Sequence, residues 1–560
     1  MTDQIPDAPT TRAFNENSRR WLGLIAIALG VALIVVDTTI VNVIVPSIIE
    51  DLKINSVQSQ WIQESYAIVL AALLLLVGRI ADIVGARRVF LTGVVIFGAS
   101  SLLAGLASTG GLLIVARFIQ GAGAAMILPT SLALLNSSFT GKARGQAFAV
   151  WGSTIGAAAA LGPLLGGWLS EHLSWRWAFG VNIPLVIVIF AASMVFLDRS
   201  PKVPGRVDVL GALLSVVGLG FLAFGLIEGR TYGWITVKEP LTLLGYTWSS
   251  GPSPVAVALI LAVVALAGFA TRQTVLTRSS DPERALMDVR LFSIGSFRNG
   301  NIATLIIGVG EFGIVAVLPL WLQFTLGYSA VQAGLALVPI AIGSFVASGA
   351  SFALAAKASP LDLVRLGLLL EAFGLAGLAF VAAVDAPWWH LAGVLFFYGI
   401  GVGFATAQVT NVVLNDVPEQ NSGQASGIQS AFRQLGSALG IAVLTTTFFS
   451  TLSSTLNAAL TAEHTPPQQA DDLTHAVTDS AGAAIEGLAA QPQTQFVADA
   501  ARDAMTHSVT LAGYIAAGVI VLGLIATAFI RSQPPRPAPG ADRPRKDEPS
   551  AGRHRQAGKG

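Results

Sequence analysis

The sequence predicts an all-α polytopic membrane protein, a class in which helices satisfy their own backbone hydrogen bonds within the bilayer. Of its 560 residues, 53% are hydrophobic and 12% are charged, about half the charged fraction of soluble domains. Apolar stretches of about twenty residues, the length that crosses a bilayer core, recur along most of the chain. Basic residues gather in alternate loops, as membrane topology requires.

The first six predicted spans follow one another with short polar loops, as in a compact helix bundle. The opening span continues an apolar run that begins at Trp21, although it carries Asp37. Spans four and five are rich in glycine and alanine, which let transmembrane helices approach closely. The six spans cover residues 21–45, 61–80, 88–107, 111–134, 145–170 and 177–197.

Eight further spans bring the predicted total to fourteen. Two of them, 207–227 and 254–271, are set apart by polar linkers within residues 198–290. The last six form a second bundle within residues 291–530, and a long polar segment separates the final two spans. These six cover residues 298–322, 331–355, 361–383, 389–414, 423–449 and 508–530.

The charges of the short loops alternate between the two sides of the predicted membrane. One side has acidic residues such as Glu50, Asp51, Glu171 and Asp385, with few basic ones. By the positive-inside rule the other side is cytoplasmic, so we expect a cell-membrane protein with both termini inside. The cytoplasmic set comprises Arg19, Arg20, Arg87, Arg88, Lys142, Arg144, Arg199, Lys202, Arg206, Arg272, Arg278, Arg284, Arg290 and Arg298.

Three polar segments lie outside the spans. Residues 1–20 are expected to form a cytoplasmic tail, because no small-residue cleavage site marks a signal peptide. Residues 531–560 are rich in Pro, Gly and Arg, a composition that predicts a disordered cytoplasmic tail. Residues 451–507 are acidic and form the predicted outer loop, whose composition is typical of a solvated connector.

A short internal repeat relates spans four and five to spans twelve and thirteen. Gly145 to Ala147 (GQA) recurs as Gly423 to Ala425, and Ala160 to Gly162 (ALG) recurs at the same separation as Ala438 to Gly440. The repeat predicts two related bundles, residues 21–197 and 291–530, with two extra helices between them. This is the plan of many secondary transporters, which bind their substrate near the midplane between the bundles.

Several functional classes are excluded by missing residues or motifs. The chain has no cysteine, which excludes disulfides, thiolate metal sites and cysteine nucleophiles. It has no phosphate-binding P-loop, no HExxH and no GxSxG, so we expect neither an enzyme nor a cofactor. Gly308 to Gly313 fits GxGxxG, but without a preceding strand its glycines are expected to allow close helix approach. A net charge of +1 gives no indication of a nucleic-acid partner.

Four segments resemble motifs of one transporter family. The loop from Gly78 to Arg88 resembles the signature loop between helices two and three of the major facilitator superfamily. Arg117 to Gly123 is similar to its fourth-helix motif, and Gly162 to Gly167 to the fifth-helix motif of its antiporters. Asp37 to Pro46 resembles the first-helix motif of the fourteen-helix drug:proton antiporter branch (QacA/EmrB type). The resemblance covers about residues 20–530 and implies the major facilitator fold, with two six-helix bundles plus two extra helices.

The sequence also departs from this branch in two places. The glycine expected four residues before Gly162 is Ala158. Quaternary-ammonium exporters of the branch carry acidic residues in helices ten and thirteen, and neither predicted span has one. The second departure argues against dicationic substrates.

The resemblance assigns the loop motif, with Gly78, Asp82, Gly85, Arg87 and Arg88, to a breakable clamp that holds the outward-facing state. A carboxylate near the start of the third helix is favoured by the helix dipole, and the arginines can pair with it or with neighbouring helix ends. The alternative is that these arginines only set the membrane topology.

The fifth-helix motif, with Gly162, Pro163, Gly166 and Gly167, is expected to act as a hinge or seal between the bundles. Glycines permit tight helix packing, and a proline frees a backbone carbonyl within the span. The alternative is static packing with no movement.

Charged residues within the predicted spans are costly in hydrocarbon and are therefore functional candidates. At 1.5 Å per residue, Asp37 lies roughly 24 Å from the cytoplasmic end of its helix, and Arg117 lies roughly 9 Å from the outer end of its own. In a core of about 30 Å these depths are similar. The fold that the resemblance implies makes the two helices neighbours, so the two side chains are expected to pair, directly or through Gln120. Asp37 then either contributes to proton coupling or forms a purely structural bond, to Arg117 or to a hydroxyl such as that of Thr38.

Four glutamates complete the set of membrane charges. Glu311 and Glu371 lie near the middle of their spans and are candidate proton or substrate sites, although each could instead make a structural bond. Arg433 is a possible charge partner for one of them. Glu64 and Glu228 lie near outer helix ends, where their carboxylates are expected to reach interfacial water.

These observations predict a proton-coupled antiporter that exports lipophilic or cationic small molecules across the bilayer by alternating access. An exporter of an endogenous metabolite, antibiotic or lipid is the closest alternative. A non-transporting membrane sensor or scaffold, with the outer loop as its working part, is a more remote one.

Overall fold

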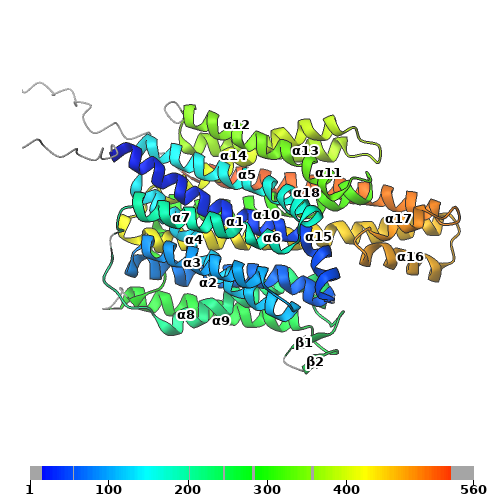
Figure 1. Cartoon of the computed structure of the whole chain (residues 1–560), viewed down its shortest axis with the longest axis horizontal. Coiled ribbons are helices and arrows are strands. Elements are labelled where there is room, and N and C mark those ends of the chain that lie inside the picture. Colours follow the sequence, from blue (N-terminus) through cyan, green and yellow to red (C-terminus); the bar gives the residue numbers. More distant parts are fainter. Residues whose placement is uncertain are drawn as a thin grey trace, which may run out of the picture.

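The computed structural model describes residues 16–530 except 55, 201, 244–245, 280–283 and 355–357. The two predicted tails therefore lie outside the described residues, apart from 16–20. Within the described residues, fourteen helical segments are long and apolar enough to cross a membrane, which confirms the predicted number. In Figure 1 these helices lie nearly parallel to one another, along the long axis of the molecule.

The first bundle contains six membrane spans, the last of which is built from two helices. Its fourth helix begins where the Thr109 side chain accepts a hydrogen bond from Leu112 N. The boundary between its second and third helices is Gly85, whose φ of 101° suits glycine. The bundle comprises α1 (Glu16–Leu52), α2 (Ser56–Val84), α3 (Ala86–Gly105), α4 (Gly110–Ser138), α5 (Gly141–His172), α6 (Arg176–Gly180) and α7 (Asn182–Phe196).

The two inserted helices, α8 (Val209–Tyr232) and α9 (Pro254–Arg278), pack against each other, and α8 also packs against α2 of the first bundle. They are joined by a short antiparallel hairpin, β1 (Leu241–Leu243) and β2 (Tyr246–Trp248), that the sequence analysis did not predict. After α9 the chain passes through a 3-10 turn, η2 (Val289–Ser293), into the second bundle.

The second bundle repeats the plan of the first. Ser329 and Gln332 form a capping box at the start of its second span. Gly308 and Gly313 let its first helix approach Gly436 and Gly440 closely, as expected from the GxGxxG pattern. The bundle comprises α10 (Gly295–Phe324), α11 (Ala330–Ala336), α12 (Val338–Leu354), α13 (Pro360–Val381), α14 (Trp388–Leu414), η3 (Glu419–Asn421), α15 (Ser422–Ala462) and α18 (Gln495–Ala528).

Residues 451–507 differ from the solvated connector that their composition suggested. α15 continues to Ala462, α18 begins at Gln495, and α16 (Pro467–Asp479) and α17 (Ala484–Ala489) lie between them. Buried apolar side chains such as Leu456 and Val497 recur along these helices and continue the main apolar core into this segment. In Figure 1 it extends to the right, beyond the other helices. We call the end of the molecule formed by these helices, from α15 through α16 and α17 to α18, the hairpin end. The opposite end, with Arg87, Lys142 and Arg290, is the basic end.

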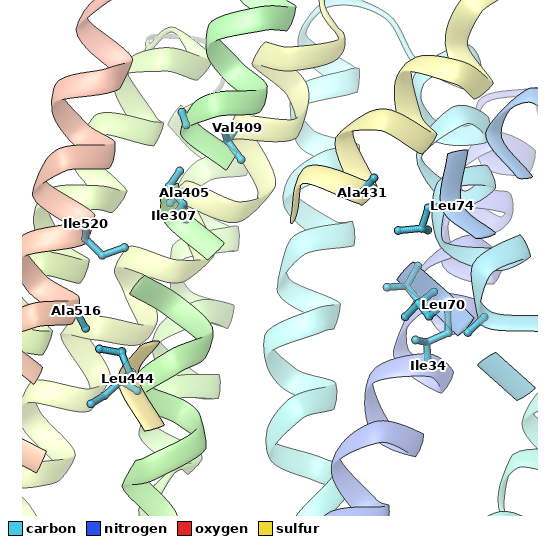
Figure 2. Close-up of a cluster of buried hydrophobic side chains, with 14 of the residues drawn as sticks. Ile34, Leu70, Leu74, Ile307, Ala405, Val409, Ala431, Leu444, Ala516 and Ile520 are labelled. Carbon is cyan, nitrogen blue, oxygen red and sulfur yellow. The ribbon is translucent and has the colours of Figure 1, made fainter. Parts of the chain in front are cut away.

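The packed interior is apolar, and large apolar side chains also cover the outside. Figure 2 shows Leu444 of α15 with Ile520 of α18 in the second bundle, and Ile34 of α1 with Leu70 of α2 in the first. On the outside, several apolar residues of α9 have more than 60% of their surface exposed. Such an exposed apolar belt suits contact with lipid rather than water.

Candidate functional site

Asp37 lies at the centre of a buried polar network in the first bundle. Its carboxylate accepts a hydrogen bond from Arg117 Nη1 at 2.5 Å, and the side chains of Asp37 and Arg117 are 0% and 1% exposed. Gln120 Nε2 and Asn182 Nδ2 each donate to Asp37 Oδ1 at 2.8 Å. The structure thus pairs Asp37 with Arg117 and Gln120, as their depths indicated. The alternative partner, Thr38, instead donates its hydroxyl to Ile34 O.

Further contacts fix the guanidinium of Arg117 within this network. Its Nε donates to Ile62 O at 3.0 Å, and its Cζ lies 4.4 Å from the centre of the Tyr66 ring. Because Arg117 and Gln120 are three residues apart, both lie on one face of α4. Gly121 lets this face approach α2, since a Cβ there would lie 2.6 Å from Tyr66 O. The sequence did not predict that Asn182 of α7 and Ser101 of α3 belong to this network. Ser101 accepts hydrogen bonds from both Gln120 and Asn182.

A second group of charges lies in the other bundle. Glu311 of α10 is 3.9 Å from Arg433 of α15, and Thr406 of α14 donates its hydroxyl to the same carboxylate at 3.3 Å. The hydroxyl of Tyr398 donates to the Glu311 backbone carbonyl at 3.0 Å. The structure therefore brings Arg433 to Glu311, while Thr406 carried no sequence signal, being an ordinary polar residue in a span.

Glu371 of α13 differs from the other membrane carboxyl groups. It is 0% exposed, and neither carboxylate oxygen has a hydrogen-bond partner among the described residues. A carboxylate in this position would be an isolated negative charge away from water, which costs several kcal/mol or more. A protonated carboxyl group avoids most of that cost.

Asp82 lies near the end of α2, not near the start of the third helix as the sequence analysis expected. The helix ends just before Gly85, and the Asp82 side chain points across to the second bundle. There its Oδ1 and Oδ2 accept hydrogen bonds from Gly423 N at 2.6 Å and Gln424 N at 2.8 Å. Gly423 and Gln424 belong to the first turn of α15, where unpaired N–H groups and the helix dipole favour a carboxylate.

Close backbone approach makes this contact between α2 and α15 possible. A Cβ on Gly78 would lie 2.6 Å from Gly423 O, and one on Gly427 would lie 2.8 Å from Leu74 O. Of the arginines in the loop motif, Arg79 interacts electrostatically with Asp82. Arg87 Nη2 donates to Met194 O near the end of α7 at 2.7 Å, and Arg88 is exposed.

Polar residues that the sequence analysis did not select also join the two bundles at the basic end. Arg144 Nε donates to Asn411 Oδ1 at 3.2 Å, and its Nη2 donates to Asn415. Asn136 Nδ2 donates to Ser422 Oγ at 3.4 Å. Arg144 and Ser422 each directly precede a copy of the repeated GQA segment, which was the available signal for these two residues. Together with Asp82 they close the basic end.

The glycines of the fifth-helix motif face helices of both bundles. A Cβ on Gly162 would overlap Thr39 Oγ1, and one on Gly166 would lie 2.8 Å from Ile40 Cγ1, so α5 packs directly on α1 beside Asp37. Gly167 faces Val331 of α11 in the second bundle. Pro163 lies within α5, but its side chain is outside the described residues.

The family model of the Major Facilitator Superfamily matches residues 27–441. The chain belongs to this superfamily. Its fourteen spans and its relatives agree with the drug-exporting branch that the motifs resembled. It is a multi-pass membrane transporter rather than an enzyme.

Two curated relatives illustrate the similarity in sequence. The puromycin resistance protein pur8 of Streptomyces alboniger is 34% identical over 416 residues, which cover 73% of this chain and 77% of pur8. The multidrug efflux pump LfrA of Mycolicibacterium smegmatis is 31% identical over 436 residues, which cover 76% of this chain and 80% of LfrA. Such relatives support a drug exporter.

A solved structure shows the same fold at low sequence identity. The human organic anion transporter MFSD10 (TETRAN) superposes with a TM-score of 0.57 at 13% identity, covering 91% of this chain and 99% of that protein. This likeness confirms the predicted fold class.

Proposed function

We propose that the protein is a proton-coupled antiporter that exports lipophilic or cationic small molecules from the cell by alternating access. In this proposal it lies in the cell membrane, with the basic end and both termini in the cytoplasm. The described structure then corresponds to a state that is closed on the cytoplasmic side.

The observation that carries the proposal is the isolation of Glu371. Since neither oxygen of its buried carboxyl group has a hydrogen-bond partner among the described residues, the group is most stable with a proton in the present arrangement. Movement of the bundles that admits water to Glu371 would stabilise the ionised form and release the proton. A carboxyl group whose preferred charge depends on the conformation links proton movement to alternating access.

The neighbouring charges support this role. Arg433 lies beside Glu311, and both belong to helices that pack in the same bundle as α13. A cationic substrate that entered this region would compete with Arg433 for the carboxylates, or with the proton for Glu371. That competition couples the export of one cation to the entry of another.

The substrate class follows from the relatives and from the composition of the spans. Curated relatives carry drug resistance or drug efflux in their names. The interior is mainly apolar with few charges, which suits lipophilic molecules that bear at most one positive charge.

The experiment is transport by the purified full chain in proteoliposomes with an imposed pH gradient. A permanently charged lipophilic monocation serves as the dye, because pH partition alone cannot accumulate it. In vesicles whose lumen is acid, outward proton flow should drive the dye inward. With potassium and valinomycin on both sides to hold the membrane potential at zero, a protonophore should abolish this accumulation.

Glu371→Gln should lose pH-driven accumulation, because an amide cannot release a proton. Glu463→Gln, a change of the same kind on an exposed residue of the hairpin end, is the matched control and should transport normally. Dye movement that is the same with and without the gradient, or normal coupling in Glu371→Gln, would overturn the proposal.

A further inference from the structure

Glu228 of the inserted helix α8 is buried, contrary to the expectation that it reaches interfacial water. The whole residue is 0% exposed. The stacked rings of Trp61 and Phe224, about one turn before Glu64 and Glu228, hold these parts of α2 and α8 together. The Glu228 carboxyl group lies within reach of the Glu64 carboxyl group and of the Thr231 side chain. The pair therefore joins an inserted helix to the first bundle. Apart from the contacts of Ile62 and Tyr66 on α2 with Arg117, these two helices contribute nothing to the Asp37 or Glu311 groups.

An apolar shell, in large part aromatic, surrounds the two carboxyl groups on the hairpin side. The ring of Trp61 stacks on that of Phe224 at 6.2 Å, and Phe224 stacks on Tyr232 at 6.3 Å. Leu241 of β1 packs in the same cluster, so the small hairpin between α8 and α9 covers this site. The shell keeps bulk water from Glu228.

A hydrogen bond between two carboxyl groups requires a proton, since two carboxylates offer only acceptors. Two ionised carboxylates in contact within an apolar shell would also repel each other strongly. We propose that Glu64 and Glu228 form a carboxyl pair that binds one proton at the hairpin end of the interface between α2 and α8.

The other titratable groups near the pair do not supply a positive counter-charge. Glu239, in the segment before β1, adds a further negative charge, and Tyr232 is a titratable side chain beside Glu228. Lys238 of the same segment bonds Tyr232 through its backbone, and its side chain is exposed. Arg230 is two residues away on α8, but its guanidinium lies 3.3 Å from the centre of the Phe449 ring and donates to Thr478 O. The helices that pack on α8 carry as basic residues Arg79, near the basic end of α2, Arg272 and Arg278, near the basic end of α9, and Arg433 in α15, beside Glu311.

The position of the pair suggests what its proton controls. Loss of the proton would place two like charges between α2 and α8 and weaken that contact. Arg230, on the same helix, holds α8 against α15 and α16 through Phe449 and Thr478. The carboxyl pair thus makes the attachment of the inserted helices sensitive to pH at the hairpin end, independently of the proton that Glu371 carries in the proposed transport cycle.

The test counts protonated carboxyl groups in the purified full chain in lipid nanodiscs, by the infrared carbonyl stretch of protonated carboxylic acids at neutral pH. Glu64→Gln and Glu228→Gln should each remove the same single band, and the double variant should remove no more, because the two residues share one proton. Glu371→Gln is the control and should leave that band in place.

A second measurement keeps the result independent of the infrared assignment. In the wild-type chain the melting temperature should fall as pH rises and the pair loses its proton. Glu228→Gln should remove this part of the pH dependence, because the amide donates to Glu64 without a titratable proton. The proposal is wrong if neither single variant removes a band, if each removes a different one, or if the melting profile keeps its pH dependence. None of these readouts requires transport, so the result is separate from that of the proteoliposome assay.

Discussion

Asp37 and Glu371 are both fully buried carboxyl groups, but their surroundings differ in a way that separates their roles. Three side chains from two other helices donate hydrogen bonds to Asp37, and one of them carries a positive charge. Glu371 receives no donor from the described residues. We infer that Asp37 holds α1, α4 and α7 in register with the coupling machinery, whereas Glu371 is the group that exchanges its proton.

Replacement of Asp37 by Asn tests the first half of this inference. The change leaves the buried guanidinium of Arg117 without a counter-charge, which should destabilise the fold by about 3–5 kcal/mol. The melting temperature of the purified variant should therefore fall, and pH-driven dye transport should be lost.

A double variant separates stability from coupling. Asp37→Asn with Arg117→Gln removes the orphan charge and should recover much of the melting temperature without restoring transport. Asp472→Asn, an exposed change on α16, should alter neither property. Normal coupled transport by Asp37→Asn would show that the carboxylate has no part in the cycle.

At the scale of elements, the decisive contact is a side chain of one bundle that caps a helix of the other. Asp82 of α2 occupies the N-terminus of α15, where it satisfies two backbone N–H groups. The contact depends on glycine, since a Cβ on Gly423 would collide with the Asp82 carboxylate. It is made of two hydrogen bonds and can break without unfolding either helix.

Gly423→Ala should therefore weaken the closed state of the basic end. A shift of about 1–2 kcal/mol, the scale of a lost helix cap, would change the open-to-closed ratio roughly 5- to 30-fold. Spin labels at Lys142→Cys and Arg298→Cys, both exposed at the basic end, report the distance between the bundles. Gly393→Ala is the control, since nothing lies near a Cβ at that position. An unchanged distance distribution in Gly423→Ala would contradict the clamp.

The inserted helices have their own junction at the basic end. Arg272 of α9 binds Asp208 at the start of α8 with a shortest distance of 2.6 Å, and Gln273 accepts hydrogen bonds from Leu286 N and Met287 N in the linker. Burial alone would raise the pKa of the Asp208 carboxyl group. The hydrogen bonds from Arg272, Gly211 and Gln273 outweigh burial and lower the pKa below its ordinary value of 3.8.

The sign of this shift predicts a pH dependence. Because the folded-state pKa is depressed, the stabilisation is fully present above the ordinary value of 3.8 and is lost as pH falls through the lower, folded value. Asp208→Asn should lower stability at pH 7 by about 1 kcal/mol, a modest figure because solvent screens the partly exposed Arg272. Melting curves of the variant and the wild type should converge at acid pH. A difference that persists at pH 2 would assign the effect to packing instead.

At the scale of the whole molecule, two bundles built on one plan meet at the basic end through polar contacts. Asp82, Asn136 and Arg144 of the first bundle bond residues between Asn411 and Gln424 of the second. Contacts of this kind suit alternating access, because hydrogen bonds between rigid bodies can exchange for bonds to water when the bodies separate.

The absence of cysteine allows a direct test of that movement. Asn136→Cys with Ser422→Cys replaces a hydrogen-bonded pair across the bundles by two thiols. Oxidation should lock the basic end closed and stop transport, and reduction should restore it. Each single variant should be insensitive to the oxidant. Undiminished transport by the fully crosslinked protein would rule out opening at this end.

Much of the fold could be predicted because membrane spans are encoded locally. Asp37 and Arg117 were placed at matching depths by counting residues along two helices, and the structure joins them. Gly308 was linked to a helix contact by the spacing of its glycines, and Gly162 by the fifth-helix motif that its segment resembles. In contrast, residues 451–507 were described by composition as a connector, although buried side chains such as Val497 stabilise helices there.

The sequence by itself determined the number of spans, the charged and neutral loops and the family, since hydropathy and motifs are properties of short segments. Only the tertiary structure decided which helices face one another: it placed Asp82 on the first turn of α15, Glu228 against Glu64, and Glu371 where no described residue donates to its carboxyl group. These arrangements depend on contacts between residues far apart in the chain, so no local pattern carries them. The chemistry of each carboxyl group follows from that surrounding, because burial and donors decide whether a charge or a proton is stable there.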